Sequence, residues 1–328
     1  MVGSYHIIIQ NSIVKYEFDI NRNITVIKGD SATGKTVLVD MIREFVLNGS
    51  DSGITLSSSI PCRVVEGSTW EEQLSLITGS IVFIDEGNRF VSSHDFARKV
   101  REGKNYYVIV TRERLNNLPY SVTEIYGIHS SGKYENLVPV YHEMYRIYDS
   151  ELKDKSINLY EYCSEMIIED TNSGYEFFAS LTNENIKCIS ANGKDNIFNM
   201  ISNQRLEEQI LIIADGAAFG CEMERVYDIV RKCNNMHLYL PESFEWIILK
   251  SGIIRDKLIN EILEKTEDFA DSEEFFSWER FYTYKLIELT KDTYLAYNKS
   301  KLNDNYKHKG IMSSILQSIE GINFREEE

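Results

Sequence analysis

Residues 24–41 read ITVIKGDSATGKTVLVDM, and this stretch decides the fold of the first part of the chain. An apolar run leads to Gly29, and Gly34 follows with Lys35 and Thr36 directly behind it. The glycines let consecutive backbone N–H groups curl around phosphate oxygens, and the positive end of a following helix dipole favours the same anion. Apolar residues after Thr36 recur at helical spacing, so the stretch predicts a strand, a phosphate-binding loop and a helix.

The pattern Gly-x-x-x-x-Gly-Lys-Thr is that of a P-loop, which predicts ATP as the bound nucleotide and Mg²⁺ as its metal. The predicted nucleotide-binding residues are Gly29, Asp30, Ser31, Ala32, Thr33, Gly34, Lys35 and Thr36. Among them, Lys35 is expected to reach the β and γ phosphates and to act in catalysis. The Thr36 hydroxyl is expected to be a ligand of Mg²⁺.

A second motif lies at 81–86, where four apolar residues precede Asp85 and Glu86. It resembles a Walker B segment, in which Asp85 would hold Mg²⁺ through water and Glu86 would orient or deprotonate the attacking water. The next apolar run, YYVIVT, ends at Thr111, which we expect to sense the γ phosphate. The alternative is that the two acids only cap the start of a helix.

The 328 residues predict two α/β domains, because short apolar runs alternate with helical spacing twice along the chain. Residues 1–140 are expected to form a P-loop NTPase domain with a parallel sheet, and 141–165 a helical connector. Residues 166–255 are expected to form a second α/β domain, and 256–328 an acidic, helical C-terminal segment.

In the second domain, acidic residues follow the apolar runs. Glu169 follows the first run and Asp215 follows 210–214, with Glu222 just inside the next predicted helix. Ligands of parallel sheets bind beyond the carboxyl ends of the strands, and carboxylates are ligands that Mg²⁺ prefers. We therefore expect Glu169, Asp215 and Glu222 to be candidates for facing a ligand of this domain; the metal role follows from the resemblance described next. The alternative is that these acids cap helices and stay solvated.

The segments IIEDTNSGYEFF and ILIIADGAAFG resemble the first and third elements of a topoisomerase-primase (TOPRIM) domain. That resemblance implies Mg²⁺-dependent phosphodiester chemistry, with Glu169 and the first aspartate, Asp215, as ligands. Ala217 stands in the position of the second aspartate, and Glu222 or Asp195 could replace it. A P-loop ATPase followed by a TOPRIM domain resembles a reduced overcoming-lysogenization-defect (OLD) nuclease, over about 1–130 and 163–240. This resemblance implies that ATP regulates assembly or access to DNA, and that the acidic site nicks or cuts it.

Composition limits the partners. The formal net charge of −16 argues against extensive DNA contact, because phosphate neutralisation requires clustered Lys and Arg. The apolar runs are too short to span a bilayer, no signal peptide is recognised, and five Cys without a CxxC pair predict a cytoplasmic protein. Candidate partners are therefore the nucleotide, DNA and further copies of the chain, with no membrane. The alternative function is a non-catalytic, nucleotide-dependent switch or partner-binding protein.

Overall fold

The computed structural model describes residues 1–29, 33–131, 140–148, 157–182, 185–203 and 209–324. The predicted nucleotide-binding residues Asp30, Ser31 and Ala32 lie outside this part of the chain. By their internal contacts, the residues divide into two compact units. Unit 1 consists of Met1–Tyr148 and Glu267–Ser277, and unit 2 consists of Asp149–Thr266 and Trp278–Glu328.

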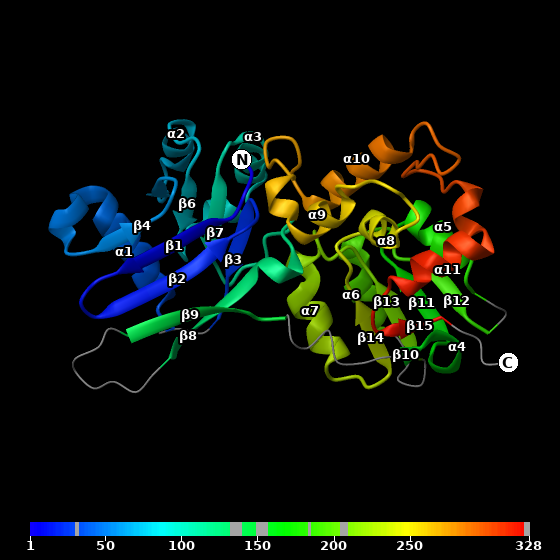
Figure 1. Cartoon of the computed structure of the whole chain (residues 1–328). Coiled ribbons are helices and arrows are strands. Elements are labelled where there is room, and N and C mark those ends of the chain that lie inside the picture. Colours follow the sequence, from blue (N-terminus) through cyan, green and yellow to red (C-terminus); the bar gives the residue numbers. More distant parts are fainter. Residues whose placement is uncertain (30–32, 132–139, 149–156, 183–184, 204–208, 325–328) are drawn as a thin grey trace. The chain divides into compact units, whose positions relative to one another are not determined.

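Unit 1 contains a nine-stranded sheet (Figure 1). Its strands lie in the order β4 (Thr55–Ser57), β1 (Tyr5–Gln10), β2 (Val14–Ile20), β9 (Val140–Arg146), β8 (Ile125–Ser131), β3 (Ile24–Ile27), β7 (Tyr106–Val110), β6 (Ile81–Ile84) and β5 (Cys62–Val64). The strands β3, β7, β6 and β5 run parallel, as predicted, whereas β1 pairs antiparallel with β2 and β4, and β8 pairs antiparallel with β9. The α/β class is confirmed, but the predicted parallel sheet is only part of a mixed sheet.

Burial explains why the strands differ. Every residue of β3, β6 and β7 is buried, as in strands that are covered on both faces. In β1 and β2, buried residues alternate with more exposed ones, as in an antiparallel sheet with one solvated face. Gly29, Asp85 and Thr111 follow these fully buried, parallel strands.

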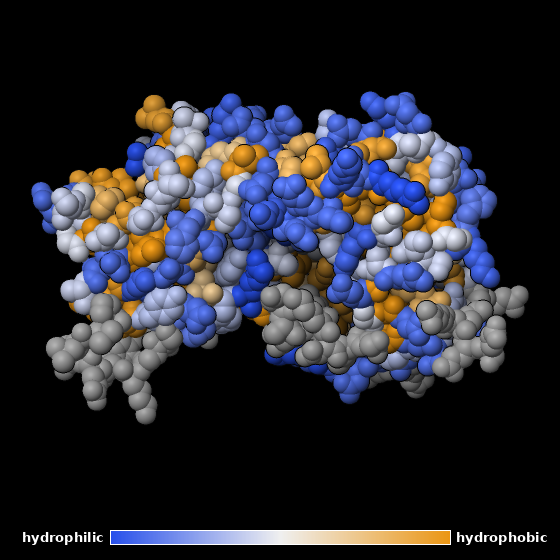
Figure 2. Space-filling model, viewed as in Figure 1, coloured by the Kyte–Doolittle hydropathy of each residue, from blue (hydrophilic) through white to orange (hydrophobic). Residues whose placement is uncertain are grey.

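The helices of unit 1 follow the parallel strands. They are α1 (Lys35–Asn48), α2 (Trp70–Ser75) and α3 (His94–Glu102), with 3₁₀ turns η1 (Gly49–Ser52), η2 (Arg89–Ser92) and η3 (Val122–Glu124). α1 buries Leu38, Val39 and Ile42 in a core that also contains residues of β1, β6 and β7. Val46 and Leu47, near the C-terminal end of α1, are exposed. On the face drawn in Figure 2, hydrophobic residues show at the surface between hydrophilic ones.

A segment distant in sequence completes unit 1. The backbone N–H of Gly3 donates to the carbonyl oxygen of Glu267 over 2.7 Å. The side-chain amide of Asn23 donates to the carbonyl oxygen of Phe276 over 3.1 Å. The sequence predicts that residues 267–277 belong to the acidic, helical C-terminal segment 256–328. Only η4 (Thr266–Asp268) is helical there, and residues 267–277 belong to unit 1.

Unit 2 is built on a four-stranded, wholly parallel sheet in the order β12 (Lys187–Ser190), β11 (Glu165–Ile168), β13 (Ile210–Ile213) and β14 (Met236–Tyr239). The helices that follow these strands are α5 (Ser173–Ala179), α6 (Lys194–Ser202), α7 (Gly220–Val230) and α8 (Phe244–Lys250) (Figure 1). The second alternation of strands and helices that the sequence predicts is therefore confirmed.

The remaining elements of unit 2 are β10 (Ile157–Asn158), α4 (Leu159–Tyr162), α9 (Ile259–Glu264), α10 (Trp278–Thr290), η5 (Asp304–Lys307), α11 (Lys309–Gln317) and β15 (Ile322–Asn323). The prediction of a helical connector at 141–165 is wrong. Most of β9 lies there, followed by β10 and the single turn of α4. β9 forms because it is held between β8 and β2, a long-range pairing that local composition does not indicate. No helix in the described ranges is long and apolar enough to cross a membrane.

Candidate functional site

The P-loop sequence connects β3 to α1 in unit 1. Gly29 and Gly34 have φ values of 124° and 93°, a region of backbone conformation that favours glycine. A β-carbon on Gly34 would lie 2.7 Å from the Tyr16 hydroxyl, so a larger residue would also collide there. The two glycines of the motif therefore stand where the backbone itself requires them.

Lys35 is the first residue of α1, and its side chain folds back over the loop. It is 5% exposed, and its Nζ donates to the carbonyl oxygen of Gly29 over 2.8 Å and to Thr33 Oγ1 over 3.0 Å. The ammonium thus joins the two ends of the loop. Thr36, the predicted Mg²⁺ ligand, is exposed in the first turn of α1.

The three strands that carry the nucleotide motifs end side by side. β7 lies between β3 and β6, and the register pairs Ile27 with Val110 and Ile84 with Ile109. Asp85 and Thr111, which follow β6 and β7, therefore lie at the same edge of the sheet as the loop that follows β3. The structure brings Asp85 and Thr111 to the edge of the sheet at which β3 ends before Gly29.

Asp85 and Glu86 have different surroundings. Burial is the main cause that raises the pKa of Asp85, and the charge of Asp40 in α1 raises that pKa further. The N–H of Glu86 donates to Asp85 Oδ1 over 2.8 Å and lowers the pKa in part. Glu86 Oε1 lies 2.6 Å from the Nε of Arg112, whose side chain is 53% exposed. The ion pair holds Glu86 at the surface, where water reaches it.

Thr111 is 5% exposed. Its N–H donates to the carbonyl of Ile27 over 3.2 Å, and its hydroxyl oxygen accepts the N–H of Glu113 over 3.0 Å. The first bond ties Thr111 to the last residue of the strand before the P-loop. Its position next to the loop is therefore determined by backbone pairing.

Unit 2 contains a pocket of about 300 Å³ at the carboxyl ends of its strands. The residues that line it are Glu169, Asp170, Thr171, Asn192, Gly193, Asp215, Phe244, Glu245, Glu279 and Lys299. Because Ile168 of β11 pairs with Ile213 of β13, the next residues converge, and the Asp215 N–H donates to Glu169 Oε2 over 2.9 Å. Two of the three residues predicted to bind metal in this domain therefore meet.

The carboxyl groups of Glu169 and Asp215 both have raised pKa values. Burial raises the pKa of Glu169 to about 7, against the partial compensation of the Asp215 N–H. Burial, together with the charges of Glu279, Glu169 and Glu245, raises the pKa of Asp215 well above its usual range. Near neutral pH the pair therefore carries less than two negative charges.

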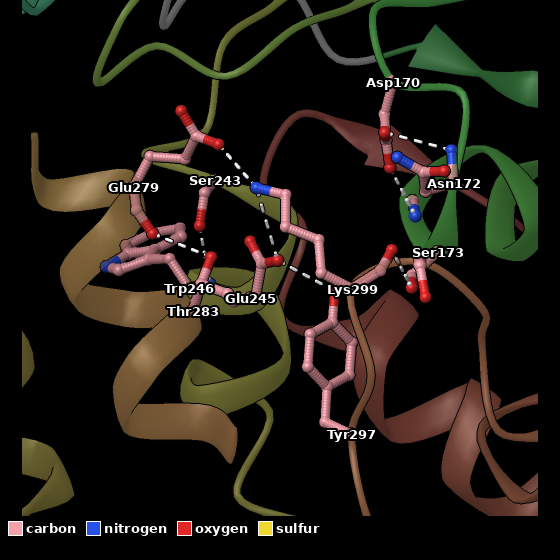
Figure 3. A network of polar contacts seen from close by, with 12 residues as sticks. Asp170, Asn172, Ser173, Ser243, Glu245, Trp246, Glu279, Thr283, Tyr297 and Lys299 are labelled. Carbon is pink, nitrogen blue, oxygen red and sulfur yellow. Dashed lines mark hydrogen bonds and ion pairs between the residues drawn. The ribbon is translucent and has the colours of Figure 1, made fainter. Parts of the chain in front are cut away.

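A lysine is held by two other acids of this pocket (Figure 3). The Nζ of Lys299 lies 2.5 Å from Glu279 Oε1 and 3.8 Å from Glu245 Oε1, and the hydroxyl of Tyr297 donates to Glu245 Oε1 over 2.8 Å. Burial by itself lowers the pKa of Lys299, but Glu245, Glu279 and Asp215 outweigh it and raise that pKa above its ordinary value. The Lys299 ammonium thus compensates part of the acidic charge.

Glu245, Glu279 and Lys299 are absent from the sequence predictions. Glu279 and Lys299 lie in the C-terminal segment, where the pattern of α10 indicates packing and no motif surrounds either residue. Glu245, Glu279 and Lys299 share no feature of the sequence except that their side chains are charged. Asp170 contacts the pocket too, but its carboxylate accepts the N–H groups of Thr171 and Gly174 at the start of α5 and so serves as a cap.

Glu222, the third predicted metal ligand of this domain, does not line the pocket. Its fully buried carboxylate on α7 pairs with Arg225, one turn along the same helix. Ala217, in the position of the second aspartate, is 2% exposed. Over the described part of the chain, no group of three or more His, Cys, Asp or Glu side chains is arranged to hold a metal ion. Glu169 and Asp215 are thus the pair left for the predicted metal role.

No protein-family model matches the chain, and a search of the curated proteins finds no match. The functional assignment rests on the geometry of the two sites.

Proposed function

We propose that this chain is a P-loop ATPase whose unit 1 binds ATP with Mg²⁺. The observation that carries the proposal is the Gly29–Thr36 motif between a buried strand and a helix, at the sheet edge where Asp85 and Thr111 also lie. A glycine-containing loop before a helix N-terminus can offer backbone N–H groups, and Lys35 can offer an ammonium, which together suit a polyphosphate.

Each residue has a proposed role. Lys35 would contact the β and γ phosphates, Thr36 and Asp85 would hold the metal, and Thr111 would sense the γ phosphate. Bound Mg²⁺ supplies positive charge that neutralises the transferring phosphoryl group. Glu86 takes the proton of the attacking water, for which its position at the surface gives solvent access.

The test is calorimetric titration of the whole chain with ATP and Mg²⁺. Lys35→Ala is expected to weaken binding at least about tenfold, because a charged hydrogen-bond donor to phosphate is lost. Lys104→Ala is the control, since Lys104 is 61% exposed and pairs with Glu273. Absence of ATP binding by the wild type, or equal binding by Lys35→Ala, would overturn the proposal.

A second proposal concerns unit 2, which we infer to be TOPRIM-like and, with unit 1, similar to a reduced OLD nuclease. The adjacency of Glu169 and Asp215 at the ends of β11 and β13 supports metal-dependent DNA nicking. The alternative is a nucleotide-dependent switch without nuclease activity. It is supported by Lys299, which already pairs with two acids of the pocket, and by the separate pairing of Glu222.

Plasmid nicking in Mg²⁺ or Mn²⁺ separates these two functions. If unit 2 is a nuclease, the wild type nicks DNA and Asp215→Ala does not. Glu261→Ala is a suitable control, because Glu261 is exposed on α9. No nicking by the wild type supports the switch, and equal nicking by Asp215→Ala would remove this pocket from the reaction.

A further inference from the structure

Two aromatic rings from neighbouring strands lie against the P-loop. The parallel pairing of β2 with β9 puts Tyr16 opposite His142. Their rings stack with centroids 4.7 Å apart and planes inclined by 12°. Both side chains are buried, Tyr16 fully and His142 to 8% exposure. The pair therefore forms a rigid surface within the sheet.

Gly34 sits directly on this surface. The Tyr16 hydroxyl donates to the carbonyl oxygen of Gly34 over 2.8 Å. A β-carbon on Gly34 would lie 2.7 Å from that hydroxyl and 3.0 Å from Cε1 of His142. Burial raises the pKa of the Tyr16 hydroxyl, so it stays protonated and available as a donor.

The same carbonyl begins α1. Gly34 O accepts the N–H of Leu38 over 3.0 Å, the first hydrogen bond of the helix. An oxygen that accepts from both Tyr16 and Leu38 has its peptide plane held from two directions. The orientation of that plane sets where the next N–H groups, those of Lys35 and Thr36, point.

We propose that Tyr16 is a positioning residue for phosphate binding, which acts through the Gly34 carbonyl and rests on the ATPase function proposed above. Its hydroxyl holds the first turn of α1 in the conformation that presents N–H groups to phosphate. A loop held in its binding conformation loses less entropy when the ligand arrives, and so binds more tightly. Tyr16 itself need not touch the nucleotide.

Tyr16→Phe tests this, because it removes the hydroxyl and keeps the ring on His142. The expected result is ATP binding about two- to tenfold weaker than in the wild type, the range for one lost hydrogen bond. The KM for ATP is expected to rise by the same factor, with kcat unchanged. Exchange of the Leu38 amide with solvent deuterium is expected to accelerate.

Tyr106→Phe is the matched control. Tyr106 is also a buried tyrosine of this sheet, 1% exposed, and its hydroxyl lies 3.3 Å from the carbonyl of Gly3, away from the P-loop. A general loss of stability would affect both variants alike, whereas positioning weakens binding only in Tyr16→Phe.

The outcomes separate this inference from the ATPase proposal. If the wild type binds ATP through Lys35 but Tyr16→Phe binds equally well, the role of Tyr16 is refuted and the ATPase remains. Equal losses in both tyrosine variants also refute it. If the wild type binds no ATP, the ATPase proposal is refuted, and the role of Tyr16 in phosphate binding is refuted with it. If Tyr16→Phe folds poorly, unchanged exchange of the Leu38 amide in the folded fraction overturns the inference.

Discussion

Glu169→Gln is expected to stabilise the folded protein at alkaline pH and to leave it nearly unchanged at acid pH. The variant keeps the size of the side chain and an oxygen that can accept the Asp215 N–H, which lies 2.9 Å away in the wild type. It removes only the ability to ionise. The pKa of Glu169 is about 7 in the folded protein, against an ordinary value of 4.5.

The direction and size of the effect follow from this difference. A raised carboxyl pKa contributes stability that is fully present below pH 4.5 and is lost as the pH rises through about 7, since the unfolded chain ionises more readily. Each pKa unit corresponds to about 1.4 kcal/mol. Relative to the wild type, the free energy of unfolding of Glu169→Gln should therefore increase by about 2 to 3 kcal/mol between pH 4.5 and pH 8.5.

The assay is urea unfolding at both pH values, followed by tryptophan fluorescence. Trp246 and Trp278 belong to unit 2 and report on its transition, whereas Trp70 belongs to unit 1. Glu261→Gln, on an exposed position of α9, is the control and should change stability little at either pH. A difference between Glu169→Gln and the wild type that is the same at both pH values would refute the reasoning, as would a less stable variant at pH 8.5.

Two further predictions concern the charged groups of each unit. Glu86→Gln should bind ATP as the wild type does but hydrolyse it at least about 100-fold more slowly, because a general base is lost. Release of phosphate measures the hydrolysis rate, and Glu113→Gln is the control. A Glu86→Gln variant that hydrolyses ATP at the full rate would contradict the role of Glu86 as general base. Lys299→Met should lower the stability of unit 2 by about 1 to 2 kcal/mol at pH 7, less than for a fully buried pair because Lys299 is 37% exposed. Thermal unfolding tests it against Lys301→Met, and equal melting temperatures would show that the Lys299 ion pairs are not stabilising.

The parallel strands could be predicted from the sequence because their signal is local. The strands β3, β6 and β7 are buried on both faces, so each is a continuous apolar run that stands out from its neighbours. The strand β9, which pairs parallel with β2 and antiparallel with β8, has no such run. Its residues include His142, Glu143 and Arg146, and it became part of the predicted connector because only its pairing with β2 and β8 makes it a strand.

The acidic pocket was predicted in part. Glu169 and Asp215 follow apolar runs directly, and the rule that parallel strands present ligands at their carboxyl ends indicates both residues. The same rule misplaces Glu222, whose partner Arg225 lies three residues further along α7 and could have been recognised from helical spacing. No local pattern links Glu245, Glu279 and Lys299, which are far apart in the chain.

The candidate phosphate-binding loop can be recognised from the sequence, because Gly29, Gly34, Lys35 and Thr36 lie within eight residues and their predicted chemistry depends on the backbone that joins them. What surrounds that loop and the second site depends on the tertiary structure. The Tyr16–His142 surface under Gly34 depends on the register of two strands, and the pairing of Lys299 with Glu279 depends on how the last segment packs in unit 2. Such contacts join residues distant in sequence, and they form only when burial of the core brings their elements together.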